Sequence, residues 1–303
     1  MDELRFDDRV VVVTGAGHGI GRAHALLFAA RGAKVLVADY GVAIDGSGSS
    51  SSPAEDVVSE IRAAGGDAVA CFADVSDEES AASIIGVAVS SFGRLDAVVN
   101  NAGIHDPAPF EQLTTAQFRR MMDVHFFGTL FVTQAAWIHF LATGYGRIVN
   151  TTSEAMLGGI SQLSSYGAAK GAVFGLTRNL ATEATGTGIR VNALAPRADT
   201  RMSASEQDRL AGLFGMDDET MKAVSASMPP DMCSPAALYL AHESCILNGE
   251  VLRVGMGSAA RLAVIHTEGL TGDPITPEDI SENLATILAI DNAALTSAAN
   301  MAP

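Results

Sequence analysis

A glycine-rich turn directly after a run of valines restricts how this chain can fold more than any other feature. Residues 10–13 are four valines, apolar on both faces, as a buried parallel strand must be. Residues 14–21, Thr-Gly-Ala-Gly-His-Gly-Ile-Gly, follow, and a helical pattern begins within them. In a strand–turn–helix context, glycines let the backbone approach a pyrophosphate at the N-terminus of the helix. We therefore predict a dinucleotide-binding turn that includes Gly15, Gly17, His18, Gly19, Ile20 and Gly21.

Short β-branched runs alternate with longer amphipathic ones through the rest of the chain. Further strands are expected at residues 34–38, 68–72, 97–99, 147–150 and 190–194, and helices at 19–31, 54–64, 77–92, 115–141 and 164–184. This alternation is typical of the α/β class, with a doubly wound parallel sheet between two layers of helices. A ligand crevice is expected at the point where the strand order reverses.

Two segments depart from this alternation. Residues 45–53 are rich in serine and glycine, which favours a flexible loop, although the same loop could cover the adenosine end of a cofactor. Residues 257–303 form a C-terminal appendage, with a loop and then a helix from Thr276 to about Ile290. Because no linker or repeat is visible, we predict one domain over residues 1–303, with its core at about 8–255.

Asp39 ends the second predicted strand. A carboxylate at this place can accept hydrogen bonds from both ribose hydroxyls of adenosine, and it repels a 2′-phosphate. Tyr40 and Gly41 follow, so no basic residue stands next to Asp39 to bind such a phosphate. The sequence therefore favours NAD over NADP. The alternative is that Asp39 only caps the loop after the strand.

Two more groups follow the third and fourth predicted strands, at the carboxyl edge of the sheet. We expect Asp74 to bind the adenine amino group, with Val75 beside it. Asn-Asn-Ala-Gly follows the fourth strand, and we expect Asn101, Ala102 and Gly103 to let the backbone approach the ribose. Taken alone, Asn-Ala-Gly is also typical of a turn.

Tyr166 and Lys170 lie four residues apart in a helical pattern, so their side chains share one face. A nearby cation stabilises a phenolate and lowers its pKa from about 10 toward neutrality, which makes tyrosine a useful acid or base. A bare Tyr-x-x-x-Lys is more often an ordinary helix pair. Ser153 strengthens the catalytic interpretation, because it follows the fifth predicted strand and its hydroxyl can hold the substrate oxygen.

With these motifs the chain resembles the short-chain dehydrogenases/reductases. The likeness rests on the glycine-rich turn at 14–21, on Asn-Asn-Ala-Gly at 100–103 and on Ser153, Tyr166 and Lys170, and it spans about residues 8–255. It implies a Rossmann-type domain, NAD as the cofactor at Tyr166, Lys170 and the turn, and hydride transfer between a secondary alcohol and a ketone. It also implies a homodimer or homotetramer built through helices 115–141 and 164–184.

Two positions depart from the family pattern. His125 stands where the family usually has a catalytic asparagine, whose backbone carbonyl holds a water that leads to the lysine. We consider equally that His125 serves this relay and that it is a packed helix residue. Arg197 stands in Ala-Pro-Arg, where the family usually has Pro-Gly, and could bend the loop or face solvent. In this loop Pro196 and Thr200 are expected to contact the nicotinamide.

The substrate is expected to be lipid-like. Several segments, among them residues 39–41 and the C-terminal Thr-Pro-Glu-Asp, resemble the (3R)-hydroxyacyl-CoA dehydrogenase unit of peroxisomal multifunctional enzymes. Residues 199–232, rich in methionine, are expected to form a lid over an adaptable apolar pocket, although a self-packed helix hairpin explains at least half of them. The alternatives are a hydroxysteroid or terpenoid dehydrogenase and a non-catalytic NAD-binding regulator, which the intact Ser153, Tyr166 and Lys170 disfavour.

Composition excludes several other classes of function. The formal net charge of −16 opposes binding to nucleic acid and to anionic membranes. The three cysteines show no metal-binding spacing, so we expect no metal site and reduced thiols. The charged N-terminus does not resemble a signal peptide, and no apolar run approaches the length of a membrane span. We expect a cytoplasmic protein that acts on a small alcohol or ketone.

Overall fold

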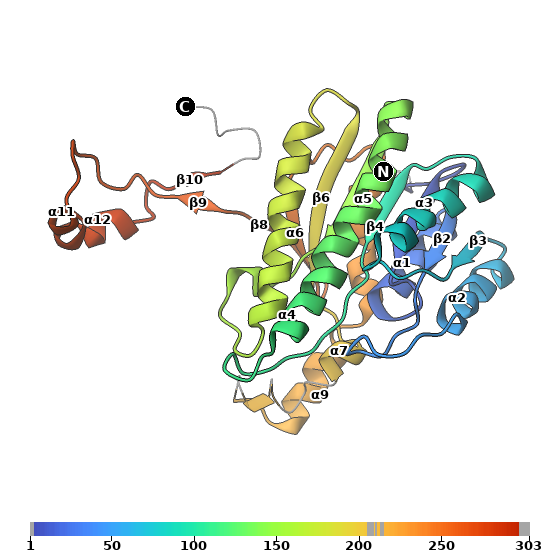
Figure 1. Cartoon of the computed structure of the whole chain (residues 1–303), viewed down its shortest axis with the longest axis horizontal. Coiled ribbons are helices and arrows are strands. Elements are labelled where there is room, and N and C mark those ends of the chain that lie inside the picture. Colours follow the sequence, from blue (N-terminus) through green and yellow to red (C-terminus); the bar gives the residue numbers. More distant parts are fainter. Residues whose placement is uncertain (1–2, 205–208, 210, 213–214, 297–303) are drawn as a thin grey trace.

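One mostly parallel sheet forms the centre of the molecule, with helices on both faces (Figure 1). The computed structural model describes residues 3–204, 209, 211–212 and 215–296. Within them the strands of this sheet follow the order β3-β2-β1-β4-β5-β6-β7-β8. They are β1 (Val10–Thr14), β2 (Lys34–Ala38), β3 (Asp67–Cys71), β4 (Ala97–Asn100), β5 (Gly146–Thr151), β6 (Ile189–Pro196), β7 (Val251–Gly255) and β8 (Ser258–Leu262). The order reverses between β1 and β4, which confirms the predicted doubly wound α/β/α fold.

The four valines of β1 show why both faces of the sheet are covered. Val11 and Val13 lie in one core with helices α1 (Gly19–Ala30), α2 (Ser52–Ala63) and α10 (Ser234–Ala241). Val10 and Val12 lie in the opposite core with α3 (Glu78–Phe92), α5 (Gly128–Thr143) and α6 (Ser164–Glu183). All four side chains are fully buried, and each contributes roughly 1.5–3 kcal/mol of hydrophobic stabilisation.

The long helix predicted at residues 115–141 is interrupted. It consists of α4 (Thr115–Met122), a π-helical turn η1 (Asp123–Phe127) and α5. Thr114 caps its start in a reciprocal capping box with Gln117, and Gly144 ends it in the left-handed conformation. By length and composition alone Thr115–Thr143 is apolar enough to span a membrane, with a mean hydropathy of 1.3. Part of this apolar surface packs beneath the sheet, through Val132 and Phe140, whereas Ile138 and Leu141 stay exposed.

Two strands at the far edge of the sheet were not predicted. β7 carries Leu252 and Arg253 half-exposed, and β8, Ser-Ala-Ala-Arg-Leu, pairs antiparallel with it. Beyond β8 the appendage projects away from the body as an arm (Figure 1). It contains a hairpin of β9 (Ile265–His266) and β10 (Ala294–Leu295) with α11 (Pro277–Glu282) and α12 (Leu284–Leu288). The single helix predicted to Ile290 is therefore wrong, because the chain leaves the helical conformation at Asn283.

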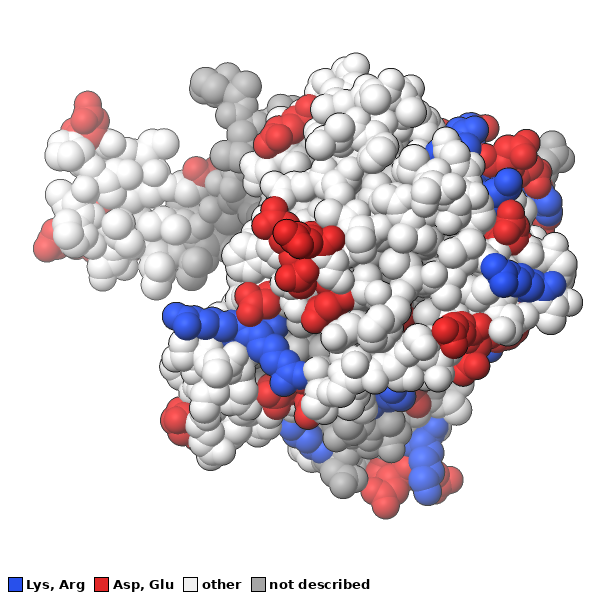
Figure 2. All heavy atoms as spheres, turned by 45° about the vertical axis from the view of Figure 1, so that its right-hand side comes forward, with Lys and Arg blue, Asp and Glu red and all other residues white. Residues whose placement is uncertain are grey.

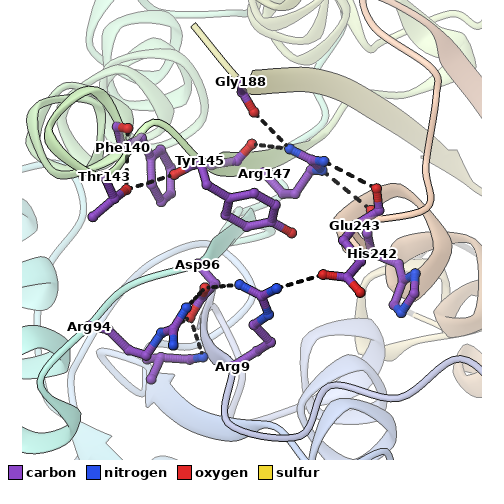
Figure 3. Close-up of polar contacts among 12 residues, drawn as sticks. Arg9, Arg94, Asp96, Phe140, Thr143, Tyr145, Arg147, Gly188, His242 and Glu243 are labelled. Atoms are coloured by element: carbon purple, nitrogen blue, oxygen red, sulfur yellow. Dashed lines mark hydrogen bonds and ion pairs between the residues drawn. The ribbon is translucent and has the colours of Figure 1, made fainter.

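A polar network ties together the end of the sheet opposite to the glycine-rich turn (Figure 3). The carboxylate of Asp96 is almost fully buried and accepts hydrogen bonds from the Val10 amide (2.9 Å) and from Arg9 (2.9 Å). Arg94 binds the same carboxylate through two nitrogens, at 2.8 and 2.6 Å. The Arg9 guanidinium also lies over the Tyr145 ring, 4.9 Å from its centroid. The start of β1 is thereby joined to the starts of β4 and β5.

Candidate active site

A cavity of about 320 Å³ opens at the carboxyl ends of β1 to β5, next to the point where the strand order reverses. Most of the predicted site residues line it, namely Gly15, His18, Gly19, Ile20, Asp39, Asp74, Val75, Asn101, Ala102, Gly103, His125, Tyr166, Lys170, Pro196 and Thr200. Gly17, Gly21 and Ser153 are not part of this lining. Among the residues that the structure describes, no group of three or more His, Cys, Asp or Glu could hold a metal ion.

The glycine-rich turn is fixed by hydrogen bonds to the Asn-Asn-Ala-Gly segment, which lies far from it in the sequence. Gly15 has a φ of +63°, and the Asn101 amide donates to the Thr14 and Gly15 carbonyls at 3.0 and 3.1 Å. A Cβ on Gly21 would lie 2.4 Å from that amide nitrogen, so Gly21 serves packing within the turn. The Thr14 hydroxyl accepts from the backbone amides of Asn101 and Ala102, at 3.0 and 3.1 Å. Thr14, whose role was not predicted, therefore holds the cavity residues Asn101 and Ala102 in place without lining the cavity itself.

Asp39 stands at the end of β2, in the cavity wall. Its Oδ2 accepts from the Gly17 amide and its Oδ1 from the Gly41 amide, both at 2.6 Å. A Cβ on Gly17 would come within 2.8 Å of Oδ2, so this contact requires glycine. Asp39 therefore caps its loop, as the alternative interpretation predicted. Each carboxylate oxygen can accept a further hydrogen bond, so the predicted ribose contact is not excluded by these two contacts and stays a prediction.

The segment that leads into the serine-rich loop lies beside the same cavity. Val42, Ala43 and Ile44 line it, together with Gly46 of the loop itself. The Ile44 carbonyl accepts from the His105 amide at 2.9 Å, so this segment contacts the residues after Asn-Asn-Ala-Gly. Asp74 also lines the cavity, and its Oδ1 accepts from the amide (2.9 Å) and hydroxyl (2.7 Å) of Ser76.

Lys170 is almost fully buried near the start of α6. Its Nζ donates to the Thr151 carbonyl at the end of β5 (2.6 Å) and lies 5.7 Å from the centroid of the Tyr166 ring. Burial lowers the pKa of Lys170 to about 7, because the charged form loses its hydration. The Thr152 hydroxyl donates to the Lys170 backbone carbonyl (2.9 Å), which fixes α6 to the strand end. Tyr166 and Lys170 thus share the cavity, as predicted from their spacing.

Ser153 begins the short 3₁₀ turn η2 (Glu154–Leu157), and its Oγ accepts from the Ala155 amide at 3.2 Å. This turn packs on the helix that carries Tyr166. A Cβ on Gly167 would lie 2.7 Å from the Ala155 carbonyl oxygen, so glycine next to Tyr166 permits the close approach. The catalytic role of Ser153 remains a prediction.

Two histidine rings flank Tyr166. The rings of His125 and His105 lie edge-on to it, with centroids at 5.2 and 5.5 Å. His125 is buried in the π-helical turn, its Nε2 lies 2.8 Å from the Ile104 carbonyl oxygen, and burial holds its pKa well below the usual range. The Thr129 hydroxyl donates to the His125 carbonyl (2.7 Å), the group expected to hold a relay water. The sequence analysis missed His105, which follows Asn-Asn-Ala-Gly-Ile directly.

The loop after β6 borders the cavity with Pro196 and Thr200. The Arg197 guanidinium pairs with Glu154 and keeps 42% of its side-chain surface exposed, so the side chain is partly exposed to solvent while it is held by an ion pair. The predicted lid at 199–232 contains α7 (Arg201–Ala204), α9 (Asp218–Ala226) and the turn η3 (Pro230–Cys233). In the described part of this segment Met202 lines the cavity and Met221 is buried. Leu210, Leu213 and Phe214, which we assigned to the lid, lie outside the described residues.

The family model for short chain dehydrogenases matches residues 9–211, which include the glycine-rich turn, the Asn-Asn-Ala-Gly segment and the Tyr166–Lys170 pair. The chain belongs to the short-chain dehydrogenase family. Members of this family bind a nicotinamide cofactor, and this protein is an oxidoreductase that acts on CH–OH groups. The cavity suits such a cofactor, because Gly15 and Gly19, both with positive φ, leave a side-chain-free cradle at the start of α1.

Two curated proteins illustrate the relationship to other short-chain dehydrogenases. The chain is 40% identical to a putative short-chain type dehydrogenase/reductase of Mycobacterium tuberculosis, over 94% of this chain and 96% of that protein. It is 39% identical to peroxisomal multifunctional enzyme A of Dictyostelium discoideum, over 95% of this chain. The alignment covers 62% of the Dictyostelium enzyme, so this chain matches only part of that longer protein.

Solved structures of short-chain dehydrogenases share the fold. A short chain dehydrogenase from Mycobacterium avium superposes with a TM-score of 0.77 at 35% identity, covering 93% of this chain and 95% of that one. A 7α-hydroxysteroid dehydrogenase complexed with NADH and 7-oxo glycochenodeoxycholic acid superposes with a TM-score of 0.72 at 30% identity, covering 86% and 99%.

Proposed function

We propose that this dehydrogenase uses NAD and interconverts a secondary alcohol and a ketone on a lipid-like molecule, such as a 3-hydroxyacyl-CoA. The observation that carries the choice of NAD is the position of Asp39, whose carboxylate lines the cavity beside the Gly17 amide. A 2′-phosphate there would meet a fixed negative charge. The structural neighbour that binds NADH supports the same choice.

Three side chains of this chain perform the proton chemistry in our proposal. The Tyr166 hydroxyl exchanges a proton with the substrate oxygen, and the Ser153 hydroxyl holds that oxygen by a hydrogen bond. Lys170, held on the Thr151 carbonyl, can exchange a proton near neutral pH, because its pKa is about 7. The nicotinamide, when bound, supplies the hydride chemistry. The rings of His105 and His125 pack edge-on against the Tyr166 ring and contribute to its position.

The likeness to peroxisomal multifunctional enzymes supports the acyl-CoA substrate, and the apolar side chains Val42, Ile104 and Met202 in the cavity wall suit a lipid-like chain. The neighbour that binds a 7-oxo bile acid supports a hydroxysteroid as the second candidate. The sequence shows no cluster of basic residues that would bind the phosphates of coenzyme A, and this favours the steroid candidate.

A panel of 3-hydroxyacyl-CoA, hydroxysteroid and terpenoid alcohols, followed by NADH absorbance, tests this proposal. We expect turnover with NAD, little with NADP, and loss of at least about 100-fold in Tyr166→Phe. If wild type and Tyr166→Phe both bind NAD and neither oxidises any alcohol, the protein is a non-catalytic NAD-binding regulator instead.

We also propose a cytoplasmic homodimer or homotetramer. Ile138 and Leu141 of α5 are 72% and 51% exposed, as apolar residues of a helical interface would be in an isolated chain. Figure 2 shows a wide expanse without charged side chains, bordered by groups of acidic and basic residues. Three buried free cysteines, Cys71, Cys233 and Cys245, support a reducing compartment. Light scattering after gel filtration, with Ile138→Glu as the variant expected to dissociate, tests the assembly.

A further inference from the structure

Arg197, which follows the cavity residue Pro196, forms a bidentate ion pair with Glu154, which follows Ser153. Its Nε and one terminal nitrogen donate to the two carboxylate oxygens of Glu154, at 2.5 and 2.8 Å. A planar guanidinium that meets a carboxylate with two parallel hydrogen bonds fixes direction as well as distance. The two residues are 43 positions apart in the sequence, so the pair joins two separate segments.

Glu154 is the residue directly after Ser153, and it starts the turn η2. On one side this turn rests on Gly167, next to Tyr166, where the Ala155 carbonyl approaches the helix. On the other side it is held by Arg197. The position of Ser153 is therefore set from two directions, by the helix that carries Tyr166 and by the loop after β6.

The backbone of Arg197 is itself firmly anchored. Its amide donates to the Val254 carbonyl (2.7 Å), and its own carbonyl accepts from the Cys233 thiol (3.6 Å). Gly255 has a φ of +129°, and a Cβ there would lie 2.1 Å from the Arg197 carbonyl oxygen, so the last residue of β7 must be glycine. The guanidinium thus extends from a fixed support.

We infer that Arg197 is a positioning residue for the dehydrogenase reaction. Held on Glu154, it fixes the turn of Ser153 relative to the Pro196–Thr200 loop, and so sets the substrate oxygen against the nicotinamide ring. The inference rests on the proposed function. Arg197 and Glu154 keep 42% and 30% of their side-chain surface exposed, so the pair adds little to global stability. Its effect lies in geometry, where a displacement of about 1 Å can cost about 100-fold in rate.

Arg197→Met and Glu154→Met, assayed with the best alcohol of the panel, test the inference. We expect each to lower kcat about 10–100-fold, because the contact positions reacting groups, while KM for the alcohol and the Kd of NADH change less than about threefold. The double variant should be no slower than either single one, because both remove the same contact. Arg197→Lys should recover part of kcat, because the lysine ammonium keeps the positive charge but cannot form the two parallel hydrogen bonds of the guanidinium.

Arg253→Met is the matched control. Arg253 approaches the same Glu154 carboxylate, but only at 4.0 Å. We expect its kcat to stay within about threefold of wild type, because a looser and partly exposed pair contributes little. A lowered melting temperature with unchanged kcat in Arg197→Met, or single losses that multiply in the double variant, would overturn the inference.

Hydrogen exchange of the NADH complex separates this inference from the proposed function. If wild type turns over no alcohol of the panel, the proposed function fails, and exchange then decides the role of Arg197. A positioning pair predicts that Arg197→Met raises exchange about tenfold in both residues 154–158 and 196–200, while Arg253→Met raises neither. Unchanged protection in the 154–158 segment would show that Arg197 does not hold the turn of Ser153.

Discussion

Replacing Lys170 by methionine removes a buried cation from the candidate active site, and the structure gives the size of its effect on stability. The pKa of Lys170 falls from 10.5 to about 7 on burial. At about 1.4 kcal/mol for each pKa unit, this difference amounts to about 5 kcal/mol against the folded state. The variant also leaves the Thr151 carbonyl without its hydrogen bond, which costs about 1–3 kcal/mol. Lys170→Met should therefore raise the free energy of unfolding by about 2–4 kcal/mol near neutral pH.

The sign of this effect depends on pH. Between pH 7 and 10.5 the unfolded chain binds a proton on Lys170 that the folded chain does not, so the wild type gains stability as pH rises through this window. Below the pKa of Lys170 in the folded state, Lys170 is protonated in both states, and the full cost of burying its charge reduces stability. Above its pKa in the unfolded state, Lys170 is neutral in both states and this cost disappears. The stability advantage of Lys170→Met should therefore shrink as the pH rises above 7 and reverse before pH 10.5, because it is smaller than the cost that disappears across this window.

Urea unfolding of wild type and Lys170→Met, followed by circular dichroism, measures the difference in their free energies of unfolding. The measurement is repeated about once per pH unit between pH 6.5 and 10. Turnover should fall at least about 100-fold in Lys170→Met, so stability and activity change in opposite directions. Lys34→Met, at a half-exposed lysine, is the control and should change stability little. A variant that is less stable than wild type at pH 7, with a difference that does not vary with pH, refutes the reasoning.

Other perturbations test other parts of the structure. Gly103→Ala places a Cβ 2.5 Å from Cε1 of His125 and should cost about 1–3 kcal/mol in thermal unfolding, whereas Gly86→Ala, in open space on α3, should be neutral or slightly stabilising; equal effects would contradict the close packing. Asp39→Ala should weaken NADH binding about 10–100-fold by fluorescence titration, with Asp67→Ala as an exposed control; unchanged NADH affinity would remove Asp39 from the site. Asp96→Ala should destabilise by about 3 kcal/mol, because it leaves the buried Val10 amide without its acceptor and Arg94 without its carboxylate, while Arg9 keeps only Glu243. Glu243→Ala, on the exposed side of Arg9, should change stability by less than about 0.5 kcal/mol, and equal losses for the two variants in urea unfolding would contradict the importance of burial at Asp96.

Sequence patterns correctly predicted the strands and side-chain pairs that depend only on residues close together in the chain. β1 was evident because its valines are buried on both faces, and the Tyr166–Lys170 pair because four residues span one helical turn. β8 was missed because an exposed edge strand of Ser-Ala-Ala lacks the β-branched residues that favour strands.

Long-range contacts within the site were beyond sequence reasoning. The Thr14 hydroxyl meets the Asn101 amide across 87 positions, and Arg197 meets Glu154 across 43. Nothing in the spacing of these residues indicates that the fold brings them together. His105 was missed for a similar reason, because its ring meets Tyr166 only after the loop folds back beside α6.

The π-helical turn at Asp123–Phe127 makes the length of this helix a determinant of the site. A π turn accommodates one residue more than an α-helical turn, so the side chains before it are rotated by about 100° relative to those after it. Deleting one residue here would restore a regular helix with its hydrogen bonds intact. α5 would keep its place beneath the sheet, but His125 would swing away from Tyr166 and Gly103. The number of residues in this helix, and not only their identity, therefore sets which side chains form the cavity wall beside Tyr166.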